Sequence, residues 1–319
     1  MTQSEIQSNT LFRFVHDQRM VLILLILCLA IGLLIPEFLT ANNLLNVLRQ
    51  VSITGMIAVG MTFVIITGGI DISVGAIVAL CGVVVALALK AEVGVALSIV
   101  AALAAGAAAG LANGVLVTHV RISPFVATLG TMSVFRGLTL ITANGQAIWE
   151  LPKSFIAIGT GYTFGIPNPV IIVLALFLAG HVLLRNFTFG RHVLAVGGDE
   201  DASRVSGINV QRVKLLTYAL SGLVCGLAGI VLAARLGSGQ PSIGVGFELT
   251  VIAAVVIGGT SLSGGRGSVF GTLIGALILG VVGNALNLWG VAGFYQTVVS
   301  GAIVLLAAGS DALRNRKER

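Results

Sequence analysis

The chain has 319 residues, of which 56% are hydrophobic and only 9% are charged. Soluble domains carry about 25% charged residues, and the mean hydropathy here is +1.05. These values exclude a water-soluble globule, a disordered chain and a disulfide scaffold. The chain is predicted to be an all-α, polytopic membrane protein.

The distribution of apolar residues predicts the helices, because about 20 such residues span a bilayer as a helix. Apolar runs predict about ten transmembrane helices, some of them short or broken, at 20–36, 50–68, 73–90, 94–118, 123–143, 168–184, 214–234, 249–263, 268–287 and 294–310. No soluble domain interrupts these runs. Residues 1–319 are therefore predicted to form a single transmembrane domain.

Basic residues predict the orientation. An even number of spans places both termini on one side, and with cytoplasmic termini thirteen basic residues fall in the cytoplasm against four outside. This bias is typical of cytoplasmic loops. The cytoplasmic parts are then the leader 1–19, the polar segment 185–213 and the basic tail 311–319. The net charge of +6 needs no nucleic-acid partner. The outer loops 144–167 and 235–248 are predicted to be compact turns.

A short internal similarity suggests duplicated halves, which many transporters contain. The segment 68–75 aligns with 264–271 at a constant offset of 196 residues. Small and branched residues follow both segments. A chance match in a low-complexity background is the alternative.

The sequence lacks the motifs of an enzyme. It contains no HExxH, CxxC or GxSxG motif, and no lysine follows a glycine as a Walker A loop requires. We therefore expect no catalytic residue, no metal site and no cofactor in this chain. Only Asp71 and Arg136 are strongly intramembrane, which is little for ion coupling. The energy for active transport is thus expected to enter from another chain, and a stand-alone ion-coupled transporter or facilitator is the alternative.

The polar segment 185–213 contains signals for a helix of about two turns. Asp199 can cap its amino end, and Glu200 and Asp201 follow in the first turn, where the helix dipole favours acids. Arg204 lies towards the carboxyl end, and Gly207 is placed to terminate the helix. An ordinary surface connector is one interpretation. A docking helix for a soluble partner is the other.

Four segments together resemble a known family. They are the polar segment just described and the stretches TGGIDISVG, PFVATLGTMSVFRGL and FELTVIAAVVIGGTSLSGGRGS. In their chain order, in which the polar segment comes third, they look like the permease of ribose-type sugar ABC importers, a binding-protein-dependent inner membrane component, from about residue 42 to 310. One departure is Thr250, where members commonly carry an acid.

The resemblance implies a function and partners. The chain would be the transmembrane subunit that translocates a monosaccharide across the bacterial inner membrane. Two ATPase subunits would use ATP and Mg, a second permease copy would complete a homodimer or heterodimer, and a periplasmic sugar-binding protein would deliver the solute. The coupling helix would lie near Gly197, Gly198 and the residues up to Gly207.

Six residues are candidates for the pathway or its gate: Asp71, Ser73, Asn113, Arg136, Asn284 and Asn287. Asp71 either caps the third span, with Ser73 beside it, or lines a helix break that faces a cavity. Arg136 is expected inside the bundle, where we favour a structural clamp over contact with a sugar. The asparagines are candidates because amides suit sugar hydroxyls.

Overall fold

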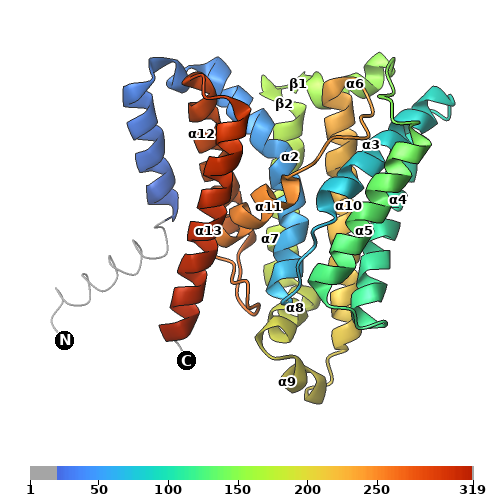
Figure 1. Cartoon of the computed structure of the whole chain (residues 1–319), viewed down its shortest axis with the longest axis vertical. Coiled ribbons are helices and arrows are strands. Elements are labelled where there is room, and N and C mark those ends of the chain that lie inside the picture. Colours follow the sequence, from blue (N-terminus) through green and yellow to red (C-terminus); the bar gives the residue numbers. More distant parts are fainter. Residues whose placement is uncertain (1–19, 318–319) are drawn as a thin grey trace.

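A computed structural model describes residues 20–317, which form a bundle of helices with small connections at both ends (Figure 1). The elements in chain order are the apolar helix Met20–Leu34, the 3-10 helix η1 (Pro36–Leu39), α2 (Ala41–Ile66), α3 (Val74–Lys90), α4 (Val95–Thr118), α5 (Pro124–Thr142), α6 (Lys153–Thr160), β1 (Tyr162–Thr163), β2 (Ile166–Pro167), α7 (Asn168–Asn186), α8 (Thr188–Gly198), α9 (Glu200–Val205), α10 (Val210–Leu236), α11 (Phe247–Ile257), α12 (Val269–Leu288) and α13 (Gly293–Lys317). The predicted leader 1–19 and the end of the tail, 318–319, lie outside the described residues.

Each apolar segment predicted from the sequence overlaps one of these helices, although α2 begins at Ala41, nine residues before the predicted 50–68. Six of them, α2, α4, α5, α7, α10 and α12, are long and apolar enough to cross a membrane. The helix Met20–Leu34, α3, α11 and the Gly293–Leu306 part of α13 are apolar but shorter. The all-α, polytopic class is confirmed, whereas the number of helices that cross the bilayer remains a prediction.

Three segments differ from the sequence prediction. The outer segment 144–167, predicted to be turns, contains α6 and the antiparallel pair β1–β2. The polar segment 185–213 is mostly helical, because α7 continues to Asn186 and α8 precedes the short α9. The span 249–263 is helical only to Ile257, since Gly259 has a left-handed backbone that ends α11.

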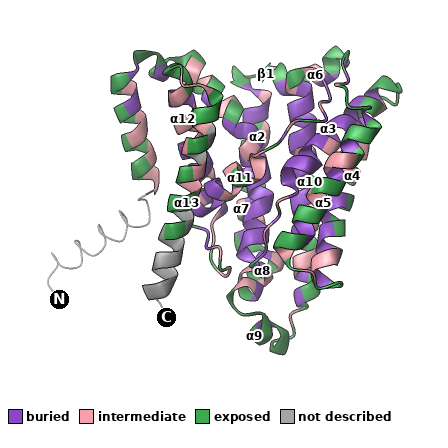
Figure 2. Cartoon of the chain, viewed as in Figure 1, coloured by how far each residue is buried: buried purple, intermediate pink, exposed green. Residues whose placement is uncertain are grey.

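The helix α10 lies at the centre of the bundle, against α2, α3 and α4 (Figure 1). Its most apolar stretch is 67% buried and that of α2 is 83% buried, whereas α5 reaches only 22%. Figure 2 shows the same contrast between the inner helices and the outward face of α5. The outward apolar side chains suit contact with lipid, and the inner helices form the core.

Glycines allow α4 and α10 to pack with their backbones in close contact. Gly106, Gly110 and Gly114 recur every four residues on α4; Gly222 on α10 lies opposite the first two, and Leu215 lies opposite Gly114. A Cβ at Gly222 would lie 2.7 Å from the Gly110 Cα, closer than real Cβ atoms approach. This face of α4 therefore packs by close backbone approach, the small-residue pattern of membrane helices.

Two non-helical segments, here called breaks, each separate two consecutive helices and reach the middle of the bundle. The segment 67–73 joins the end of α2 to α3, and the segment 237–246 joins the end of α10 to α11 (Figure 1). Since α2 and α10 are antiparallel, the two segments enter the bundle from opposite ends. They meet where Gly75 and Gly244 are so close that a Cβ on Gly244 would lie 2.5 Å from the Gly75 carbonyl oxygen.

This geometry corrects the alignment of the internal similarity. The segment 68–75 belongs to the α2–α3 break, but 264–271 belongs to the connection between α11 and α12. The two segments touch each other, because a Cβ at Gly264 would lie 3.1 Å from the Gly68 nitrogen, and Gly265 N–H donates to the carbonyl of Ile66, at the end of α2, at 2.9 Å. The break that corresponds to 67–73 in the architecture is instead 237–246, which the sequence match did not identify.

The α4–α10 contact predicts a strong effect of a larger residue at Gly222. Gly222→Val should lower the free energy of unfolding by about 1–3 kcal/mol or more, because the close backbone approach leaves no room for the side chain. Thermal unfolding of the detergent-solubilised protein, followed by size-exclusion chromatography, measures this. Gly137→Val on α5 is the control, since nothing lies within 4 Å of its Cβ position. Equal melting temperatures of the two variants would contradict the prediction.

Candidate functional site

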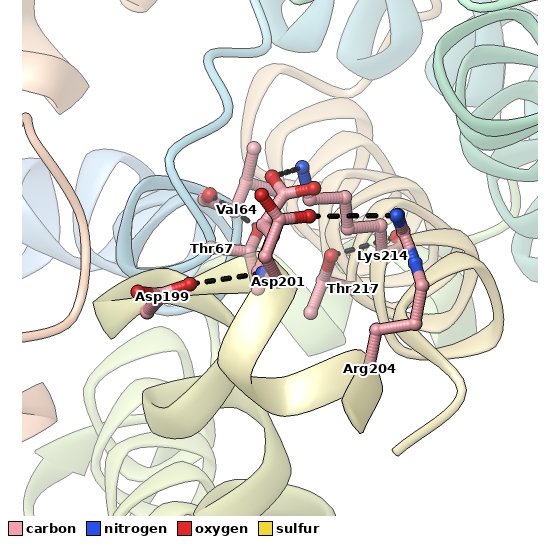
Figure 3. A network of polar contacts seen from close by, with 8 residues as sticks. Val64, Thr67, Asp199, Asp201, Arg204, Lys214 and Thr217 are labelled. Carbon is pink, nitrogen blue, oxygen red and sulfur yellow. Dashed lines mark hydrogen bonds and ion pairs between the residues drawn. The ribbon is translucent and has the colours of Figure 1, made fainter. Parts of the chain in front are cut away.

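The helix α9 has a hydrogen-bonded cap at each end, as its sequence predicts. The Asp199 carboxylate accepts from the backbone N–H groups of Asp201 and Ala202, both at 2.9 Å (Figure 3). At the other end Gly207 has φ +83° and donates to the Arg204 carbonyl at 3.1 Å. Ile208 N–H donates to the Ser203 carbonyl at 3.0 Å, which completes a Schellman motif.

The two ion pairs of α9 differ in how much they stabilise its position. Glu200 forms an ion pair with Lys214 on α10, and the lysine side chain is only 18% exposed (Figure 3). Arg204 pairs with Asp201 at 3.5 Å on the open surface, where such a pair contributes little. The Glu200–Lys214 pair is therefore the contact that ties α9 to the bundle.

The outer surface of α9 is open at the end of the bundle (Figure 1). Of its six residues only Ser203 is buried, and Val205 is 91% exposed. A cleft of about 730 Å³ lies beside it, between α9, the end of α4 and the start of α10. A helix of six residues is too short to be stable alone in water, so its caps and the Glu200–Lys214 ion pair stabilise it.

The glycines before α9 contact the bundle directly. Gly197 and Gly198 are the last residues of α8, not an unstructured lead into the cap. A Cβ at Gly197 would overlap the carbonyl oxygen of Ile66 at the end of α2. A Cβ at Gly265 would lie 2.8 Å from the Gly198 Cα. The segment that contains α9 is thus in backbone contact with both α2 and the α11–α12 connection.

Three of the pathway candidates lie in one buried network at the α2–α3 break. Asp71, fully buried, accepts from the backbone N–H of Ser73 at 3.0 Å and from its hydroxyl at 2.6 Å. The Asn113 amide on α4 donates to the Ser73 hydroxyl oxygen at 2.7 Å, and Thr131 on α5 donates to Asn113 at 2.6 Å. Ser221 on α10 donates to Asp71 at 3.4 Å. The network therefore joins the break to three neighbouring helices.

Asp71 is not the N-cap of the third span, contrary to that interpretation of the sequence. The cap residue of α3 is Ser73, which makes no side-chain cap hydrogen bond. Asp71 lies two residues further back and accepts from Ser73 itself. The chain at 71–73 folds back onto the carboxylate because the buried acid needs donors that solvent does not supply.

Arg136 binds the second break. Its guanidinium donates from Nη1 to the carbonyl oxygens of Pro241 at 2.9 Å and Ile243 at 2.6 Å. Glu248, in the first turn of α11, accepts from Gly246 N–H at 3.3 Å. Arg136 from α5 and Glu248 from α11 thus hold the segment 237–246 at the point where it meets α3.

The remaining two candidates lie at the end of the bundle opposite α9. The amides of Asn284 on α12 and Asn43 on α2 exchange two hydrogen bonds of 2.9 Å, and Asn43 also donates to the Phe38 carbonyl. Asn287 is exposed and accepts from Gln296 at 2.8 Å. Asn284 therefore joins α12 to α2, whereas Asn287 lies at the surface.

A cavity of about 370 Å³ that sequence reasoning did not find lies between α2, α10, α11, α12 and α13. Its polar lining residues are Gln50, Thr54, Arg235, Thr250 and Gln296. None of the six pathway candidates lines it. These residues stand singly in apolar runs, so no local pattern identifies them as a group.

Comparison with known proteins assigns the class. Residues 43–308 match the family model described as the permease component of the branched-chain amino acid transport system. The ribose import permease protein of Escherichia coli K12 is 46% identical over 306 residues, which cover 95% of this chain and 94% of that protein. That of Bacillus subtilis is 51% identical over 290 residues, 90% of each chain. The L-arabinose ABC transporter permease protein of Azospirillum brasilense is 41% identical over 308 residues, 97% of this chain and 91% of that protein. No solved structure matches the chain.

The fold defines a multi-pass membrane transport protein. The match over most of the chain then shows that it belongs to this family of ABC transporter permease components. Such a chain is a permease subunit and not an enzyme, since the ATPase of these systems is a separate subunit.

The contacts of Arg136 predict a local effect of its replacement. Arg136→Gln should free the carbonyls of Pro241 and Ile243, each left with an unmet bond worth about 1–3 kcal/mol. Hydrogen exchange of the amides in 237–246 should then be at least roughly tenfold faster, while exchange in α4 and α10 is unchanged. Arg136→Lys is the matched variant, since it keeps the charge but replaces the rigid, planar guanidinium with a flexible ammonium group. Unchanged exchange in 237–246 for Arg136→Gln would contradict the clamp.

Proposed function

We propose that this chain is the transmembrane subunit of an ATP-binding cassette importer that moves a monosaccharide, ribose-like or another simple sugar, across the bacterial inner membrane. The relatives named as ribose and L-arabinose permeases support the solute class. The observation that carries the coupling is the doubly capped, open helix α9, whose flanking glycines contact the bundle backbone.

The orientation follows from the end of the bundle at which α9 lies. The described chain finishes at the end of α13, near residue 317, towards that same end (Figure 1). Basic residues gather there too, among them Arg121, Arg204 and Lys214 along the cleft beside α9. Under the positive-inside rule this end is cytoplasmic. Ten spans with both termini in the cytoplasm, one domain over 1–319, and 185–213 as the coupling segment are consistent with that arrangement.

The proposed partners follow from the class and from the absence of a nucleotide motif in the sequence. Two ATPase subunits hydrolyse ATP with Mg and receive α9, with Asp199 and Gly207 keeping the helix intact. A second permease copy, identical or related, completes the transmembrane part. A periplasmic sugar-binding protein delivers the solute at the opposite end, and the bilayer surrounds the bundle.

Movement of α9 has a short path to both helix breaks. Gly197 contacts the end of α2 at Ile66, and α2 leads directly into the break that contains Asp71. Gly198 contacts the α11–α12 connection, and α11 leads back to the break that Arg136 holds. ATP-driven movement of the partner subunits would therefore reach the middle of the bundle through backbone contacts.

The pathway candidates receive different proposed roles. Asp71, Ser73 and Asn113 hold the α2–α3 break in place, and Arg136 holds the α10–α11 break. Asn284 fastens α12 to α2, and Asn287 lies at the outer surface. All except Asn287 therefore position the helices that surround the path and are not proposed to touch the sugar.

The importer function predicts dependence on partners. The test uses proteoliposomes that contain this chain with its ATPase subunits, with the binding protein added on the face opposite the ATPase. They should accumulate labelled D-ribose or L-arabinose only when ATP is supplied. The chain alone should transport neither sugar. Uptake by the chain alone, driven by a sodium or proton gradient, would instead support the alternative of a stand-alone secondary transporter.

The contact of Gly197 predicts a difference between two neighbouring glycines. Gly197→Ala should reduce transport per ATP hydrolysed about tenfold, because its methyl group overlaps the Ile66 carbonyl and overpacking of about 1–3 kcal/mol separates α8 from α2. ATP hydrolysis itself should continue. Gly198→Ala is the control, since nothing lies within 4 Å of its Cβ position. If the two variants transport equally per ATP, Gly197 has no part in coupling.

A further inference from the structure

The cavity between α2, α10, α11, α12 and α13 has the size and lining of a binding site for a small molecule. Its volume of about 370 Å³ lies within the range of about 300–1,000 Å³ that ligand pockets occupy. Most of its lining is aliphatic, with a few polar groups from separate helices. That mixture is typical of sites that bind the apolar body of a ligand and orient it by a few hydrogen bonds.

The polar groups of the cavity favour a neutral solute with several hydroxyls. Gln50 and Thr54 come from α2, Thr250 from α11 and Gln296 from α13. Gln296 already donates to the Asn287 side chain and the Val291 carbonyl, and the two threonines donate to backbone carbonyls one turn earlier, so these three groups offer acceptor oxygens to a sugar hydroxyl. The Gln50 amide can both donate and accept, as a sugar hydroxyl does. Among the described residues that line the cavity there is no carboxylate, and Arg235 already donates to the Arg49 carbonyl at 3.3 Å. Nothing in the lining therefore selects for a cation.

The cavity lies between the end of the bundle opposite α9 and the helix α11. Gln50, Arg235 and Leu286 lie near those ends of α2, α10 and α12 that are opposite α9 (Figure 1). Phe247 and Thr250 are in the first turn of α11, directly after the break. The far end of α11 leads into the connection that contacts Gly198. A single helix of 11 residues thus joins the cavity to the segment that contains α9.

We propose that this cavity is a transient binding site for the sugar inside the permease chain, with Gln50, Thr250 and Gln296 contacting its hydroxyls. The proposal rests on the proposed import function and adds where in this chain the solute binds. Displacement of α11 alters the wall that carries Thr250, so the cavity releases its sugar as α9 moves.

Gly283 offers a way to fill the cavity without disturbing the fold. It lines the cavity from the interior of α12, and nothing lies within 4 Å of its Cβ position. Alanine, leucine and phenylalanine are also better helix formers than glycine. Gly280, one turn earlier, is unsuitable because a Cβ there would overlap the Val51 side chain. Gly130 on α5 is the control, since its Cβ position is equally open and it does not line the cavity.

The experiment measures ATP-driven uptake of D-ribose and L-arabinose by the assembled transporter in proteoliposomes. Gly283→Ala, Gly283→Leu and Gly283→Phe should lower the uptake rate in that order, with about a tenfold loss or more for phenylalanine. The rate of ATP hydrolysis and the amount of assembled complex should stay within about twofold of the wild-type values. Gly130→Phe should transport normally. Normal uptake by Gly283→Phe, or an equal loss in Gly130→Phe, would overturn the proposal.

A labelling measurement tests the site without a bulky residue. Gly283→Cys in a Cys28→Ser background should react with a small thiol reagent, because the other two cysteines, Cys81 and Cys225, are buried. D-ribose or L-arabinose should slow that reaction severalfold and leave Gly130→Cys unaffected. Absence of protection by either sugar in a transporter that imports it would refute the cavity as the site. Absence of ATP-dependent uptake in the wild type would instead refute the proposed function.

Discussion

The structure depends on how interrupted helices satisfy their backbone groups away from water. An unpaired N–H or C=O in the hydrocarbon costs several kcal/mol, and both breaks expose such groups. At the first break Thr128 accepts from Ile72 N–H at 3.1 Å, and Tyr218 donates to the Ile70 carbonyl at 3.3 Å. At the second break Arg136 donates to two carbonyls. Side chains from α5 and α10 therefore make the breaks possible and fix their positions.

The interrupted helices also require close packing at glycines, because the side chains that bind the breaks must lie within hydrogen-bond distance of them. The contact of α4 with α10 holds Asn113 and Ser221 around Asp71. The approach of Gly75 to Gly244 lets the first turns of α3 and α11 meet, so that one region in the middle of the bundle contains both breaks. A protein with larger residues at these positions would separate the two breaks and lose their coupling.

The proposed coupling and the proposed binding site would both depend on one continuous framework of packed helices. The segment with α9 contacts α2 and the α11–α12 connection by backbone atoms, where side-chain flexibility cannot absorb a displacement. The helix α11 extends from that connection to the wall of the cavity. Packed cores transmit strain because they have few voids, which gives a physical route between the two ends of the molecule.

The sequence by itself determined the membrane class, the positions of the apolar helices and the caps of α9. These features follow from local composition or from residues within one helical turn, such as Asp199 with Asp201 or Gly207 with Arg204. Tertiary structure alone decided that Arg136 binds carbonyls 105 and 107 residues away, that the two breaks meet at Gly75 and Gly244, and that Gln50 and Gln296 line one cavity. In runs of alanine, valine, leucine and glycine many helix registers are similarly apolar, so the sequence pattern could not select which distant residues meet. Backbone approach and hydrogen bonding inside the bundle made that selection.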